Sequence, residues 1–162
     1  MAVTSDITAT YRGPGRVIGR MLADGRQEGR VLTFALVAGL LFFVANAPFQ
    51  AREAELDPNG PLAVRLYWSA FFWVLMVPLL AYGLAAVLWV LARITRRRIS
   101  GYGIRLSLVW ALLASSPVAL LAGLVSGFIG PGRQLDIVGL AWLAVFGWFL
   151  IAGLLRAERA GT

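Results

Sequence analysis

An arginine-rich segment between two long uncharged runs most constrains how this chain can fold. Residues 93–105 carry five arginines in thirteen positions, whereas the flanking runs 66–92 and 106–129 contain no charged residue. Clustered arginines are too strongly hydrated for hydrocarbon, and arginine beside a spanning helix is retained on the cytoplasmic side. The segment therefore predicts a cytoplasmic loop between two transmembrane helices.

Composition indicates the same class of protein. The chain is 59% hydrophobic and 14% charged, with a mean hydropathy of +0.76, whereas soluble domains carry about 25% charged residues. Two further uncharged runs, 31–48 and 137–155, are long enough to cross about 30 Å of hydrocarbon at about 1.5 Å per residue. The sequence predicts an all-α, polytopic membrane helical bundle with four transmembrane helices.

The bundle is expected to span 31–155, between an N-terminal arm, 1–30, and a short tail, 156–162. Residues 1–12 suggest a polar tail. From Pro14 the arm can form an amphipathic interfacial helix, with arginines on one face and an apolar face resting in the acyl boundary of the membrane. That apolar face would comprise Val17, Ile18, Met21 and Leu22. The alternative is a loosely ordered arm, because Gly15, Gly19, Gly25 and Gly29 weaken a helix.

The distribution of arginine predicts the orientation. All fifteen basic residues are arginine, and twelve of them lie in the arm, the 93–105 loop and the tail. The other two connections contain Arg52, Arg65 and Arg133. Positive charge is retained inside, so both termini are predicted to be cytoplasmic. The absence of lysine is typical of a GC-rich bacterial genome, which suggests the bacterial inner membrane.

These arginines point to anionic lipid on the cytoplasmic face rather than to nucleic acid, because they gather at span ends. A membrane-protein partner could use the same surface. The residues expected to contact anionic lipid or a partner are Arg16, Arg20, Arg26, Arg30, Arg93, Arg96, Arg97, Arg98 and Arg105.

Small residues recur at every fourth position of the third span, and they predict close helix packing. The stripe comprises Ser115, Ala119, Gly123 and Gly127. Its partner helix could belong to the same chain or to another. Pro78 and Pro117 predict helix kinks within their spans, and neighbouring serine hydroxyls can take up the carbonyls that Pro117 frees. A broken helix lining a substrate site is the functional alternative at Pro117.

Residues that usually carry catalysis or bind metals are scarce. The chain has no histidine and no cysteine, and the four spans contain no ionisable Asp, Glu, Lys or Arg. Proton relays, ion-coupled carriers and voltage sensors need such groups at depth. Glu53 and Glu55 could form an acid/base or metal-binding pair, but a solvated loop is the simpler interpretation. We therefore expect no enzyme activity, catalytic residue, metal or cofactor.

Three stretches have a recognisable layout: the Gly13-Pro-Gly-Arg16 and Asp24-Gly-Arg-Gln-Glu-Gly-Arg30 arm, a span ending Asn46-Ala-Pro48, and the segment 106–117 followed by Gly127-Phe-Ile-Gly-Pro131. In these stretches and in its overall layout the chain resembles the small bacterial members of the Yip1 family. Eukaryotic relatives of that family have about five spans and act as trafficking scaffolds for small lipidated GTPases. Four spans are predicted here, and bacteria lack that traffic, so the partner does not carry over. The resemblance implies a non-enzymatic membrane protein that works by association.

Two functions follow from these observations. The first is an accessory, assembly or scaffold subunit that works through helix packing and anionic lipid, with a membrane-protein partner or a second copy of the chain. The alternative is a channel or facilitator for a small neutral or lipidic solute, with Pro78 and Pro117 in a gating bundle.

The predicted orientation can be tested with reporter fusions. Fusions at Arg12, Arg98 and the C-terminus should report cytoplasm, whereas fusions at Asn59 and Gly132 should report the opposite side, because arginine-rich segments are not translocated. A fusion at Arg98 that reports the outer side would overturn the arrangement.

Overall fold

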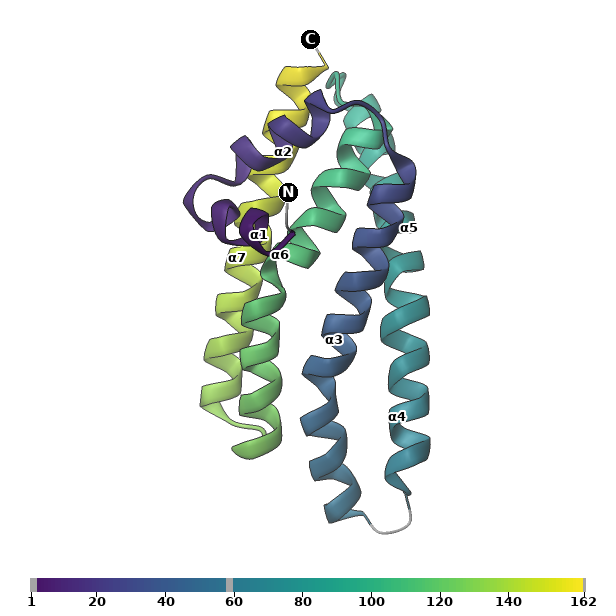
Figure 1. Ribbon diagram of the computed structural model, residues 1–162, viewed down its shortest axis with the longest axis vertical. Coiled ribbons are helices and arrows are strands. Elements are labelled where there is room, and N and C mark those ends of the chain that lie inside the picture. Colours follow the sequence, from purple (N-terminus) through teal and green to yellow (C-terminus); the bar gives the residue numbers. More distant parts are fainter. Residues whose placement is uncertain (1–2, 58–59, 162) are drawn as a thin grey trace.

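A computed structural model describes residues 3–57 and 60–161 and shows an all-helical chain (Figure 1). Four helical units are long and apolar enough to cross a membrane, which confirms the predicted fold class of a multi-pass helical protein. The elements are α1 Val3–Arg12, α2 Pro14–Ala23, α3 Glu28–Leu56, α4 Leu62–Ala70, the π-helical segment η1 Phe71–Met76, α5 Val77–Ile94, α6 Gly101–Phe128 and α7 Arg133–Ala160.

The helices extend well beyond the predicted spans, so the connections are shorter than expected. The predicted loop 50–65 is helical up to Leu56 and again from Leu62. Of its turn motif, Pro58 and Asn59 lie outside the described residues. Polar residues at the ends continue the backbone hydrogen bonding of each helix, and charge does not stop a helix once it has left the hydrocarbon.

The arginine-rich loop is likewise shortened by its own residues. Arg93 belongs to α5 and Arg105 to α6. The Ser100 side chain accepts a hydrogen bond from the Gly103 amide at 3.0 Å, and this N-cap begins α6 at Gly101. Gly101 and Gly103 are therefore helical, whereas the sequence predicts that they belong to the loop.

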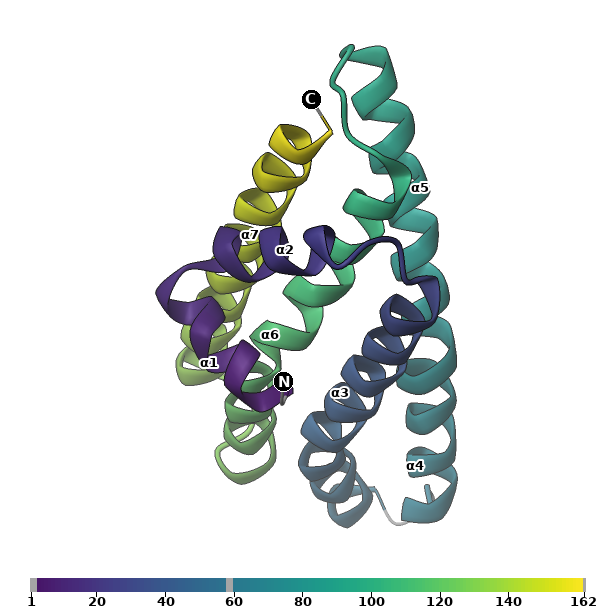
Figure 2. The same cartoon turned by 45° about the horizontal axis from the view of Figure 1, so that its top comes forward.

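Residues 1–12 also differ from expectation, because α1 occupies the segment predicted as a polar tail. Its Thr10 side chain is fully buried. Figure 2 shows α1 and α2 lying across the helical bundle, with α2 crossing α7 and α6. This segment is polar in composition, but its packing against the bundle orders it as a helix.

The small-residue stripe of α6 packs against α3 of the same chain. A Cβ on Gly123 would stand 1.8 Å from the Ala45 carbonyl oxygen, and one on Gly127 would stand 2.4 Å from the Pro48 Cβ. The two backbones therefore touch, as small residues permit in membrane helices. Ser115 and Ala119, in the same stripe, are buried. The sequence left open whether the partner helix belongs to the same chain or to another. In the structure the stripe contacts a helix of the same chain.

A second close contact joins α3 to η1. A Cβ on Gly39 would stand 2.4 Å from the Trp73 carbonyl oxygen. The Val77 amide closes the π segment by donating to Phe72, five residues back, and Pro78 follows directly. Pro78, the predicted kink, thus lies at the junction where the hydrogen-bonding pattern changes, because proline has no amide hydrogen to continue it.

Pro117 lies inside α6, which is helical from Gly101 to Phe128. Figure 1 shows the two halves of α6 running in different directions. The Ser115 hydroxyl donates to the Leu112 carbonyl at 3.0 Å. Proline leaves the carbonyl four residues back, that of Leu113, without its amide partner. The serine therefore bonds the neighbouring carbonyl and not the freed one.

Replacing Gly123 with alanine tests the α3–α6 contact. The added methyl would overlap the Ala45 backbone, so Gly123→Ala should lower the free energy of unfolding in detergent by about 1–3 kcal/mol. Gly147→Ala is the matched control, because a Cβ at Gly147 meets no atom within 4 Å. Equal stability of the two variants would contradict the packing described here.

Candidate functional site

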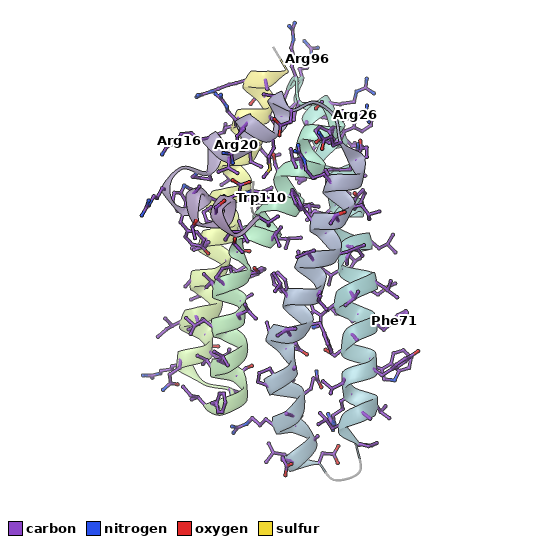
Figure 3. All side chains as sticks on the ribbon, viewed as in Figure 1. Arg16, Arg20, Arg26, Phe71, Arg96 and Trp110 are labelled. Carbon is purple, nitrogen blue, oxygen red and sulfur yellow. The ribbon has the colours of Figure 1, made fainter. Side chains whose placement is uncertain are left out.

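Charge is divided unequally between the two ends of the bundle. The upper end in Figures 1 and 3 carries α1, α2, the α5–α6 connection and the C-terminal turns of α7. Together with the α2–α3 connection, the last turn of α5 and the first turns of α3 and α6, these segments hold twelve arginines and four carboxylates, a side-chain charge of +8. The opposite end holds three arginines and four carboxylates, a charge of −1. We take the arginine-rich end as the candidate functional site.

The apolar face of α2 positions this end, although not in the way the sequence suggested. Val17, Ile18 and Met21 are each at least 96% buried, in one core with residues of α3, α6 and α7. The helix is amphipathic as predicted, but the expectation that its apolar face rests in lipid is wrong. Gly15 and Gly19 face α7 at Ala152 and Arg156, so glycine here permits close packing and does not loosen the arm.

Two buried polar contacts anchor α1 to α6. The Trp110 indole donates to the Thr10 hydroxyl at 3.1 Å, and both side chains are almost completely buried. The Tyr11 hydroxyl donates to the Ala114 carbonyl at 3.1 Å, on the turn of α6 that precedes Pro117. Burial raises the pKa of Tyr11, which keeps the phenol protonated as a donor. The ring of Tyr11 also meets Phe149 of α7 edge-on at 5.0 Å.

The docked arm fixes its arginines in different ways. Arg20 pairs with Asp6 of α1. Arg30 pairs with Asp24 at 3.0 Å and donates to the Met21 carbonyl at 2.8 Å. Arg16 is exposed and has no carboxylate partner within the described part of the chain. Arg26 and Arg30 lie outside α2. The arginine face of this helix therefore consists of Arg16 and Arg20 alone.

The arginines after α5 lie on a tight turn. Arg96 adopts a left-handed φ of 56°, and the Arg97 amide donates to the Ala92 carbonyl at 2.8 Å, which ends the helix. Arg97 pairs with Glu158 of α7 at 2.9 Å. Arg93 lies over the Trp89 ring at 4.8 Å, in cation–π geometry. Arg96 and Arg98 are exposed, and no carboxylate of the described residues pairs with them.

A single carboxylate bridges two arginines from different segments. Glu28, the first residue of α3, accepts hydrogen bonds from Arg26 at 3.0 Å and from Arg105 of α6 at 2.5 Å, both at Oε1. Beside this cluster is a cavity of about 660 Å³ between the end of α2, α5, the start of α6 and the end of α7. Arg26 and Arg105 line it together with Trp89 and Tyr102.

The other predicted site residues lie elsewhere. The small-residue stripe and both prolines lie along the spans, and Tyr11 of α1 docks on the α6 turn just before Pro117. Glu53 and Glu55 lie on the last turns of α3 at the opposite end, and Arg52 there donates to the Gly127 carbonyl at 3.4 Å. Over residues 3–57 and 60–161, no three His, Cys, Asp or Glu side chains gather where they could hold a metal ion.

Sequence reasoning missed the residues that organise this end. The sequence pattern did not single out Glu28 and Tyr102 as site residues, nor Thr10 and Trp110. A carboxylate at the start of a span, next to arginine, could have signalled Glu28. Nothing local signals the Thr10–Trp110 contact, because its two residues are 100 positions apart.

Comparison of the chain with known protein families, curated proteins and solved structures finds no match. Its function must therefore be argued from its own residues.

The anchoring of α1 can be tested by removing one buried acceptor. Thr10→Val keeps the shape of the side chain but leaves the Trp110 N–H unpaired, which should cost about 1–3 kcal/mol. We expect faster amide hydrogen exchange throughout α1. Thr8→Val is the control, because Thr8 is exposed and bonds only within its own turn. Similar exchange in both variants would show that the buried contact does not hold the arm.

Proposed function

We propose that this protein is a non-enzymatic accessory, assembly or scaffold subunit of the bacterial inner membrane. It works by association, with its arginine-rich end held against anionic lipid on the cytoplasmic face. The observation that carries the proposal is the charge difference between the two ends, +8 against −1. The positive-inside rule assigns the positive end to the cytoplasm, where anionic lipid attracts arginine by about 1 kcal/mol per charge.

Two features of the bundle support association. The outward faces of α5 and α7 consist of large apolar side chains, for example Leu79 and Leu140, 63% and 66% exposed. In a membrane these faces meet lipid or the spans of a partner. The small-residue stripe is already occupied by α3, so a partner would have to use these outer faces. The Yip1-like layout, a sequence resemblance only, is in keeping with a role in association.

A facilitator of a lipidic solute is the second candidate, and one observation favours it. An apolar cavity of about 400 Å³ lies between α3, α6 and α7 at the level of the spans, and the aromatic rings of Phe42, Trp73 and Trp142 line it. Against this candidate, the α3 and α6 backbones touch at Ala45 and Gly123, two residues that line this cavity.

Purification from cells in mild detergent, with mass spectrometry of co-eluting proteins and lipids, tests the proposal. We expect a stoichiometric membrane-protein partner and retained anionic lipid. The triple variant Arg16→Gln, Arg96→Gln, Arg98→Gln removes exposed charges that no described carboxylate balances, and lipid affinity should fall by about fivefold per charge, on the order of 1 kcal/mol each.

Arg133→Gln, an exposed arginine at the opposite end, is the control and should leave lipid retention unchanged. A homo-oligomer without a partner that carries a lipidic solute across liposomes would instead establish the facilitator. Unchanged lipid retention in the triple variant would contradict the lipid contact.

A further inference from the structure

We propose that the 660 Å³ cavity at the arginine-rich end binds the phosphate group of an anionic phospholipid. This inference rests on the lipid contact proposed above and assigns it to one site. The volume is within the range of about 300–1,000 Å³ that is usual for ligand pockets. Four observations support the assignment.

The first observation is an excess of positive charge at the cavity. Arg26 and Arg105 share a single oxygen of Glu28, so this cluster carries a net charge of +1. Arg26 and Arg105 both line the cavity. Guanidinium groups bind phosphate oxygens through short, charge-assisted hydrogen bonds.

The second observation is the start of α6 in the cavity wall. Ser100, Gly101 and Tyr102 line the cavity, and the Ser100 hydroxyl is already used by the Gly103 amide. The amides of Gly101 and Tyr102 have no acceptor within the helix, as is general for a first turn. No acidic residue is present in the first turn of this 28-residue helix, so its positive end is not offset there.

The third observation is the aromatic wall from α5. Tyr82 and Trp89 both line the cavity, about two helical turns apart. Arg93 stacks on the Trp89 ring at 4.8 Å and adds a further positive charge at that wall. Tryptophan and tyrosine are the side chains that favour the level of lipid headgroups.

The fourth observation distinguishes a lipid from a free phosphate. Ala86 lines the same wall and is exposed, and α5 is part of a candidate membrane span. The cavity therefore joins a cationic end to a surface that faces acyl chains. A ligand that uses both carries a phosphate and hydrocarbon on one molecule.

Two variants test the site by independent means. Arg26→Gln removes a cavity charge from a side chain that is 69% exposed. Gly101→Leu fills space without changing charge: a Cβ there would stand 3.6 Å from the Arg105 Nη1 and the Trp89 Cδ1, an ordinary contact, and the larger side chain would occupy the cavity. Arg133→Gln, an exposed arginine at the opposite end of the bundle, is the charge-matched control. Arg16→Gln removes a charge from the arginine-rich end outside the cavity, which separates the site from the diffuse lipid contact. Gly29→Leu is the control for bulk, because a Cβ there meets no atom within 4 Å.

The measurement is a titration of delipidated protein in neutral detergent with phosphatidylglycerol, followed by native mass spectrometry. We expect one saturable site, with affinity at least fivefold weaker in Arg26→Gln and in Gly101→Leu and changed less than twofold in both controls. Phosphatidylcholine, whose phosphate is neutralised by choline, and glycerol 3-phosphate, which has no acyl chain, should bind much more weakly than phosphatidylglycerol.

Glycerol 3-phosphate binding as tightly as phosphatidylglycerol would overturn the lipid assignment. If Gly101→Leu binds like the unmodified protein while Arg16→Gln and Arg26→Gln weaken binding equally, the site is overturned, but the diffuse lipid contact of the proposed function remains. If no arginine variant changes phosphatidylglycerol binding, both inferences fail.

Discussion

The direct contact between the backbones of α3 and α6 is the constraint on which the rest of the bundle depends. Lipid tails are as apolar as the helices, so association relies on close van der Waals packing. Gly123 and Gly127 provide it by admitting Ala45 and Pro48 of α3 to distances that any side chain would block. The remaining spans attach in the same manner, with Gly39 against Trp73 and with Gly153 of α7 against Ser107 of α6.

The N-terminal helices complete this bundle, and in doing so they create the arginine-rich end. α2 places its apolar face in the protein core, and α1 inserts Thr10 and Tyr11 against the turn of α6 that precedes Pro117. Backbone carbonyls near a proline need an internal donor in a membrane protein. The Tyr11 hydroxyl serves a carbonyl of this turn, so the arm has a structural role as well as an electrostatic one.

Electrostatics then decides which arginines are available to a ligand. Glu28, Asp6, Asp24 and Glu158 each bind arginine within the chain, and these pairs tie the arm, the α5–α6 connection and α7 together. Twelve arginines exceed four carboxylates, so most of the positive charge remains uncompensated. This excess positive charge can attract an anionic lipid surface. At the cavity beside Glu28, part of the charge lies next to an apolar wall.

The sequence by itself determined the four spans, their helical state and the separation of charge between the two ends. Hydrophobic length and arginine position are local quantities, and a membrane responds to them locally. Only the tertiary structure decided that Gly123 and Gly127 meet α3 of the same chain, that Val17 and Ile18 pack on protein and not on lipid, and that Glu28 joins Arg26 to Arg105. Glu28 and Arg105 are separated by 77 positions. A periodic pattern in the sequence shows which helix face carries small, apolar or charged residues. The partner of that face depends on how the helices cross, and a local sequence pattern does not determine that crossing.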